Sequence, residues 1–392
     1  MPLQGEQVKR RLGVFPESLL KIQEKYTKKV NFKATFIRTQ FYKTRGKQMS
    51  HSTKLRGILT ALLVQSLVLV QINSCSSDSA IQEILSLTVQ APVYLSYQSL
   101  SPTEITFSFS KEVRVTSINF APEVEVESIK EGNEVIVTLA QPLEPGRRII
   151  ADILVEDSGR NTLNVIVPFR ARNDRMPRLV FNEMRTEFQR PRVEFVEFFA
   201  LTAGNLGAMR LFIAGHSLTE AVYTFPPAEV QAGEYIVLHL RTIAEDSVDE
   251  TGTDLSLSGG NEALDTARDF WVPGSRKLLH RTSALWLIDQ DDRIIDAVLL
   301  SETPAAWGSN NTIAAAEFLS GKGAWLPADV GDAEAGRVAN ARDAISSFGT
   351  TPTRTISRDQ TVPHDRRAGN WYIVATGNAT PGRENSQRRH TF

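Results

Sequence analysis

Short stretches of alternating apolar and polar residues fill much of the segment 81–173, and turn-forming residues separate them. The alternating stretches are Ile105–Ser110, Val124–Ile129, Val135–Leu139, Arg148–Glu156 and Thr162–Phe169. A two-residue period places successive side chains on opposite faces of a strand, so each stretch can bury one face. Glu131–Asn133 and Asp157–Asn161 supply the Gly, Asn and Asp that tight turns favour. The pattern predicts a β-sandwich over 81–173.

The end of this segment also carries a family likeness. The run LEPGRRIIADILVEDSGRNTL resembles the last strands of bacterial Ig-like modules, where a Pro-Gly turn and an Asp-Gly-Asn turn flank one strand. The resemblance implies an Ig-like sandwich. An unrelated sandwich of the same class is the alternative, and it leaves the predicted architecture unchanged.

A second set of motifs follows the polar linker Asn173–Pro177, after which strands are predicted at Arg178–Met184 and Val193–Leu201. The motif residues, in chain order, are Asn182, Glu183, Glu197, Gly233, Asp296, Trp371, Pro381, Gly382 and Asn385. Residues 178–386 resemble in this order the lamin-tail domain, an Ig-like sandwich, although Ala200 replaces its usual Asn. The two resemblances together imply an all-β chain with two Ig-like β-sandwich domains in tandem.

Residues 178–386 are about twice as long as a usual lamin-tail domain, and the surplus lies in insertions at about 242–282 and 302–354. In the second insertion Val338, Ala341, Ile345 and Phe348 recur at helical spacing, which predicts a helix over Asp332–Phe348. Inserted loops often form binding surfaces. Residues 387–392 are expected to be a disordered tail.

Three aromatic residues of the insertions are candidates for contact with a partner: Phe270, Trp271 and Trp307. Aromatic side chains dominate binding hot spots when they are exposed. The alternative is that they cap the sandwich, which is the more common role of such residues.

The only cysteine, Cys75, follows a basic, then apolar, then small-residue segment over 49–74. That order is typical of a secretory signal, and the apolar run is short for a membrane-spanning helix. The ending Ile-Asn-Ser-Cys resembles the lipobox of bacterial lipoproteins, which implies an acylated Cys75 followed by a tether over 75–80. An uncleaved signal anchor is the alternative. Residues 1–48 are expected to be an untranslated or disordered leader, or else a basic transit-like one.

The charge distribution argues against nucleic-acid binding. Residues before Cys75 hold 14 Lys and Arg and three acids, so those from Cys75 onward hold 30 basic and 42 acidic side chains. Contact with phosphates needs a basic surface, which an acidic exported region does not favour.

We find no catalytic motif of the metalloprotease, serine-hydrolase, nucleotide-binding or dithiol type, and the six histidines are scattered. Asp289, Asp291 and Asp292 form the most suggestive carboxylate cluster and could hold calcium. A hairpin turn needs the same residue types, and we favour the turn. No cofactor is therefore expected apart from the covalent lipid on Cys75.

These observations favour a non-enzymatic, lipid-anchored protein of the bacterial cell envelope, either periplasmic or surface-exposed. It would contact membrane lipid through its acyl chains and present a binding, adhesion or structural module to an envelope or host protein or to a glycan. The alternative is a membrane-associated hydrolase or nuclease that uses calcium, or an accessory of one, because bacterial lamin-tail domains often accompany such enzymes.

Overall fold

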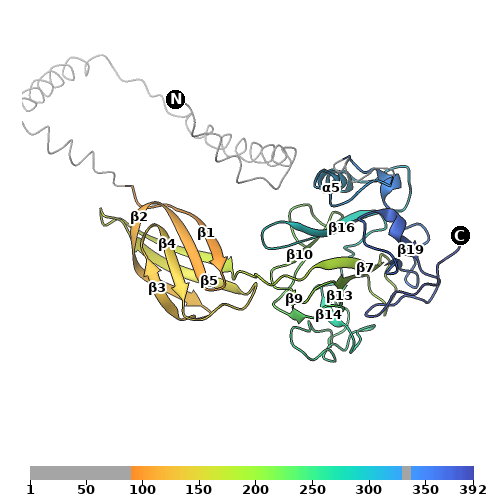
Figure 1. The fold of residues 1–392 in the computed structure, drawn as a ribbon, viewed down its shortest axis with the longest axis horizontal. Coiled ribbons are helices and arrows are strands. Elements are labelled where there is room, and N and C mark those ends of the chain that lie inside the picture. The colour runs from red at the N-terminus through yellow and green to blue at the C-terminus, as the bar shows by residue number, and fades with distance from the viewer. Residues whose placement is uncertain (1–89, 329–336) are drawn as a thin grey trace, which may run out of the picture. The chain divides into compact units, whose positions relative to one another are not determined.

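The first folded region is a β-sandwich of six strands (Figure 1). The computed structural model describes residues 90–328 and 337–392, and the chain divides into the units Met1–Gln90 and Ala91–Phe392. The strands are β1 (Tyr94–Ser101), β2 (Glu104–Ala121), β3 (Val126–Lys130), β4 (Gly132–Leu139), β5 (Arg148–Glu156) and β6 (Thr162–Arg170). The predicted leader, signal segment, Cys75 and tether lie outside the described residues.

The long strand β2 joins the two sheets of this sandwich. Its first part pairs with β1 and β4, its second part pairs with β5, and the register shifts between Ser108 and Val113. Inward-facing residues of both sheets, such as Phe107, Ile149 and Phe169, form one apolar core. The strands follow the predicted alternation closely, because every second side chain of β5 is buried.

The second folded region is larger and contains two main sheets. The first is ordered β14-β13-β8-β7-β18-β19 and the second β11-β10-β15-β16-β17, with a small β12-β9 pair beside them. The strands of the first sheet are β7 (Leu179–Arg185), β8 (Phe195–Ala200), β13 (Tyr235–His239), β14 (Arg268–Trp271), β18 (Ile356–Arg358) and β19 (Trp371–Ile373). Those of the others are β9 (Gly204–Asn205), β10 (Arg210–Ile213), β11 (Tyr223–Thr224), β12 (Glu229–Val230), β15 (Ser283–Ile288), β16 (Ile294–Ser301) and β17 (Ile345–Ser346).

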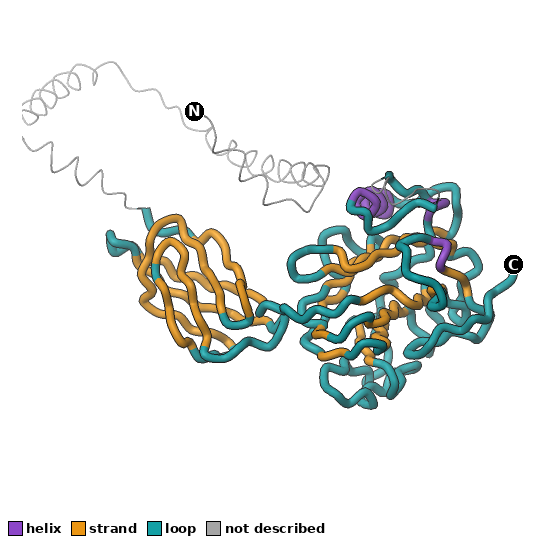
Figure 2. Tube along the Cα trace, viewed as in Figure 1, coloured by secondary structure: helices purple, strands orange, loops and turns teal. Residues whose placement is uncertain are grey.

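Strands and loops dominate both regions, as Figure 2 shows, so the all-β class is confirmed. The inner faces of the two main sheets share a single core that includes Phe198, Phe225 and Trp286. None of the helices in the described ranges combines the length and hydrophobicity needed to cross a membrane.

The predicted helix over 332–348 is wrong for the part that the structure describes. Residues 332–336 lie outside the description. From 337 onward the chain forms a short 3₁₀ helix, η2 (Ala341–Asp343), and then strand β17. Asn340 and Asp343 cap η2 reciprocally, and Ile345 pairs with Leu300 of β16. Val338 and Phe348 are 50% and 59% exposed, so the expected apolar stripe does not exist.

The α-helix of this insertion lies earlier in the chain, at α5 (Asn310–Gly321). Ser309 caps its first turn by accepting a hydrogen bond from the Thr312 backbone. Its buried face contains Ala315, Ala316 and Leu319, which pack into the second core. The insertion is thus part of the folded domain.

The closing residues also differ from expectation. Residues 387–392, expected to be disordered, continue the fold: Arg389 pairs with Val374, and the His390 backbone donates to the Ile373 carbonyl at 2.7 Å. Phe392 then stacks on Phe348 with ring centroids 5.6 Å apart. Backbone pairing with the β19 segment therefore holds a tail whose polar composition gave no strand signal.

Candidate ligand-binding groove

Five of the residues that carry the lamin-tail resemblance meet in one hydrogen-bond network: Asn182, Glu183, Glu197, Gly382 and Asn385. Asn182 Nδ2 donates to Glu197 Oε1 at 2.6 Å, and the Gly382 backbone donates to Glu197 Oε2 at 2.5 Å. Asn385 Nδ2 donates to the carbonyl oxygens of Asn182 at 3.1 Å and Arg358 at 2.8 Å. The closing segment is therefore fastened to β7, β8 and β18 at once.

Glu183 completes this network. Its carboxylate accepts hydrogen bonds from the Thr380 backbone at 3.1 Å, from Thr380 Oγ1 at 3.0 Å and from Thr355 Oγ1. Glu183 and Glu197 are both fully buried. Burial raises the pKa of Glu183, and burial together with the nearby Glu183 charge raises the pKa of Glu197 well above its ordinary value. The network is closed to ligands, and its role is structural.

A groove of about 880 Å³ lies beside the network, within the second domain. Strands β7, β8 and β16, the end of β18 and the loop after it supply its lining. Gln360 links the groove to the network, because its Oε1 accepts a hydrogen bond from the Asn385 backbone at 2.8 Å. The buried network thus fixes the side of the groove that β18 forms.

His364 and Asp296 form a polar pair in this groove. His364 Nε2 lies 2.9 Å from Asp296 Oδ1, and Asp296 Oδ2 accepts a hydrogen bond from the Phe181 backbone at 2.8 Å. Both carboxylate oxygens of Asp296 are engaged, and only the imidazole is partly exposed, at 20% of its side chain. Asp296 therefore holds the ring so that its other nitrogen, Nδ1, remains available.

Arg358 is the most deeply buried cation of the lining, with 6% of its surface exposed. Its NH2 group lies 3.4 Å from Asn182 Oδ1, and its Nε has no hydrogen-bond partner. Burial lowers the pKa of Arg358, against the favourable charge of Asp296. That Nε is buried and out of reach of a ligand, but the guanidinium forms no ion pair with a described carboxylate, so an anionic ligand would supply its missing counter-charge.

Arg178, Arg293 and Arg366 line the outer part of the groove and are exposed. Its wall is aliphatic, and the exposed members of that wall are Leu201 and Val362. Ser, Thr and Cys are absent from its described lining. The chemistry that this arrangement offers is recognition of an anion on an apolar body.

The three aromatic binding candidates do not line this groove. Phe270, Trp271 and Trp307 are buried, with 0%, 4% and 8% of their surfaces exposed. Trp271 stacks on His239 with ring centroids 3.8 Å apart and donates to Ser258 Oγ at 2.8 Å. Burial removes the basis for proposing them as partner contacts and agrees with the packing alternative.

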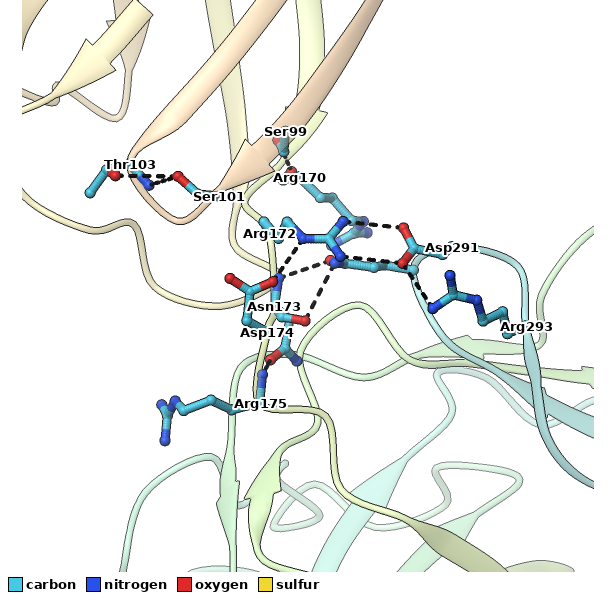
Figure 3. A network of polar contacts seen from close by, with 11 residues as sticks. Ser99, Ser101, Thr103, Arg170, Arg172, Asn173, Asp174, Arg175, Asp291 and Arg293 are labelled. Atoms are coloured by element: carbon cyan, nitrogen blue, oxygen red, sulfur yellow. Dashed lines mark hydrogen bonds and ion pairs between the residues drawn. The ribbon is translucent and has the colours of Figure 1, made fainter. Parts of the chain in front are cut away.

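The carboxylates of the calcium candidates are engaged by the protein, and Figure 3 shows Asp291 beside Arg172 and Arg293. Asp289 caps its own turn through the backbones of Asp291 and Arg293. Asp291 pairs with Arg172 at 3.3 Å, and Asp292 pairs with Arg210. Among the described residues, no three His, Cys, Asp or Glu side chains group as metal ligands would. The geometry is that of a hairpin turn, with positive φ at Asp292.

The remaining motif residues have structural positions. Gly233 sits at a turn with φ of 87°, Trp371 pairs across the sheet with Arg358, and Pro381 is buried beside Gly382. Sequence reasoning missed Arg358 and His364 as groove residues. Asp296 stood within a recognised motif, but its partner His364 lies 68 residues later in a loop, and no spacing rule joins them.

The family model TP_1001_2nd, described as a protein second domain, matches residues 177–373. A protein of Treponema pallidum (strain Nichols), titled "Uncharacterized protein", is 28% identical over 243 residues, which cover 57% of this chain and 60% of that protein. The chain thus spans less than two thirds of that relative. The crystal structure of a DUF4876 family protein from Bacteroides thetaiotaomicron aligns with 9% identity and a TM-score of 0.24, over 72% of this chain and 92% of that one.

Proposed function

The chain belongs to the TP_1001_2nd family, and from this premise we propose that it is a non-enzymatic, lipid-anchored bacterial envelope protein whose second domain binds a partner in the groove. The family match covers the lining from Pro177 to Arg366, and Met176 of the lining precedes it. The observation that carries the proposal is Arg358, a donor that lines the groove while buried and that forms no ion pair with a described carboxylate. A folded domain gains from such a donor when a ligand supplies the acceptor.

The anchor rests on the lipobox-like ending before Cys75. Acyl chains bind a bilayer with about 0.8 kcal/mol per buried CH₂, so several chains on one cysteine hold firmly. Cys75→Ala should therefore abolish labelling by radioactive palmitate and release the protein from membranes. Palmitate label on membrane-bound Cys75→Ala protein would contradict the proposed anchor and would leave the groove proposal unaffected.

Binding in the groove can be tested in the intact envelope by photo-crosslinking of the full chain. A photoreactive amino acid replaces Leu201, which lines the groove and is 40% exposed, or Ile166, which is 67% exposed on β6 of the first sandwich. We expect a discrete adduct from position 201 and none from position 166. Identical adduct patterns from both positions, or none from 201, would refute the proposal.

The His364–Asp296 pair favours a second candidate function, hydrolysis of an anionic substrate. An imidazole oriented by a buried carboxylate can activate a water, and Arg358 lies in the same groove to stabilise negative charge. Turnover of a chromogenic phosphodiester or ester that His364→Ala abolishes would favour this candidate. Turnover that survives this change would show that the His364–Asp296 pair does not cause it.

A further inference from the structure

Arg358 sets the first requirement on whatever enters the groove. Its guanidinium forms no ion pair with a described carboxylate, and within the described residues its side chain donates to Asn182 Oδ1 alone, at a long 3.4 Å. Asp296 makes no hydrogen bond to Arg358; its two oxygens pair with the Phe181 backbone and with His364. Guanidinium groups pair best with planar oxyanions, and a carboxylate offers the matching pair of acceptors.

His364 adds a second polar contact close to the first. Its Nε2 is turned to Asp296, and its Nδ1 has no hydrogen-bond partner among the described residues. An imidazole held in this way can donate from Nδ1 to an anion when it is protonated, and Asp296 then balances its charge. The pair therefore complements Arg358 on the same ligand group.

The aliphatic wall decides between classes of ligand. Leu179, Leu201, Ile294, Ile295 and Val362 line the groove beside its cations. Aliphatic side chains of a ligand would gain about 25 cal/mol per Å² by covering such a wall. The hydroxyls of a sugar would lose water there without finding enough polar partners, which costs free energy.

The arginines of the lining determine the sign of charge that the groove attracts. The lining holds four arginines (Arg178, Arg293, Arg358 and Arg366) and two aspartates (Asp289 and Asp296), and Arg293 also lies 3.7 Å from Asp291. The chain from Cys75 onward has 42 acidic and 30 basic side chains. A local basic surface on an acidic protein attracts an anionic partner over a Debye length and raises its association rate. The cationic groove is therefore suited to an acidic partner.

Resting on the proposed function, we propose that the groove binds an acidic peptide segment of a partner protein, with a carboxylate at Arg358 and His364 and aliphatic side chains on the wall. Recognition of acidic motifs by arginine clusters is a known mode of peptide binding. The groove volume of about 880 Å³ is within the usual range for ligand sites.

The test uses the full chain in detergent micelles and two blocked five-residue peptides, one with glutamate between two leucines and one with glutamine instead. Calorimetry or NMR titration should show the glutamate peptide binding at least about tenfold more tightly than the glutamine peptide, since a charge-assisted bond contributes about 1.5–3 kcal/mol. Arg358→Gln should remove this preference. Arg114→Gln, at a 68%-exposed arginine of the first sandwich, is the matched control and should keep it.

If Arg358→Gln does not fold by thermal melting, Arg178→Gln with Arg293→Gln replaces it and should weaken the glutamate peptide several-fold. Equal binding of the two peptides would overturn the inference, as would tighter binding of a uronic-acid disaccharide than of the glutamate peptide. An adduct at position 201 with either of these results would leave the proposed function standing and reject only the acidic peptide.

Discussion

The two sandwiches are stabilised in different ways. In residues 90–171 the buried polar side chains are Thr106 and Asp157, and the core is otherwise apolar. The second domain buries many charged residues, among them Glu183, Glu197 and Asp269. It also contains the pair of Arg241 with Glu194, at 2.5 Å, and the pair of Arg185 with Glu262.

This difference follows from the sequence separation of the segments that pair in each domain. The first sandwich pairs strands that are close in sequence, such as β5 with β6, so alternating apolar residues suffice to align them. The second domain must bring the closing segment back to β7, about 200 residues away, and seat two insertions on the way. Buried hydrogen-bonded groups select one arrangement, because any other leaves them unpaired.

The largest effect should come from replacing residues 303–352 by a tight turn. This removes α5, β17 and Trp325, whose fully buried indole donates to the Asp343 carbonyl at 2.9 Å. We expect the second domain to unfold while the first sandwich stays folded. All five tryptophans lie in the second domain, so their fluorescence reports on it alone, and hydrogen exchange of β5 and β6 reports on the first.

A cooperative fluorescence transition at the wild-type midpoint would show that the insertion is dispensable for folding. Trp325→Ala provides a milder test of the same point. Truncating a buried tryptophan costs about 3–5 kcal/mol. Exchange protection of the first sandwich should not change in this variant.

Next in size is the separation of a buried ion pair by Glu194→Ala. Arg241 Nε lies 2.6 Å from Glu194 Oε2, and the substitution would leave its charge buried at 7% exposure. We expect a loss of about 3–5 kcal/mol in the free energy of unfolding, measured by urea titration. Glu156→Ala in the first sandwich removes a 3.7 Å pair with the exposed Arg114 and should cost less than about 0.5 kcal/mol. Equal losses of unfolding free energy in the two variants would show that the two sandwiches do not differ in their dependence on ion pairs.

A smaller effect should follow from Gly382→Ala. Gly382 has φ of 78°, and an added Cβ would lie 2.8 Å from the Ala267 Cβ. A left-handed alanine costs about 1–2 kcal/mol, and overpacking adds about 1 kcal/mol or more. Gly377 has φ of 77° but nothing within 4 Å, so Gly377→Ala isolates the backbone cost. Similar melting temperatures for the two variants would show that the closing turn is loosely packed.

The same contrast explains what could be predicted from the sequence. The ranges predicted for β5 and β6 agree with the structure within one residue, because period and turn chemistry act locally. The order of the motifs predicted that Asn182, Glu197 and Asn385 belong to one domain. Their hydrogen bonds to one another were seen only in the structure. The helix over 332–348 failed because tertiary pairing of Ile345 outweighed a weak periodic signal. The groove depends on His364 and Arg358, whose roles arise only from residues distant in sequence.

The smallest predicted effect is a response to pH that has opposite signs in the two sandwiches. In the first, hydrogen bonds from Asn161 lower the pKa of Asp157 to about 2. Its stabilising contribution is present above the ordinary pKa of an aspartate and is lost as the pH falls toward 2. In the second domain, burial raises the pKa of Glu197, so the folded state favours the neutral carboxyl group. The stability that this group contributes is complete below the ordinary pKa of a glutamate and is lost as the pH rises. Wild-type fluorescence midpoints in urea should therefore fall as the pH rises from 5 to 7.5, and Glu197→Gln should flatten this fall, because an amide does not ionise. The exposed Glu127→Gln should leave the slope as it is. A wild-type midpoint that rises over this range would show that the network favours the ionised carboxylates, and that the second domain resembles the first in its response to acid.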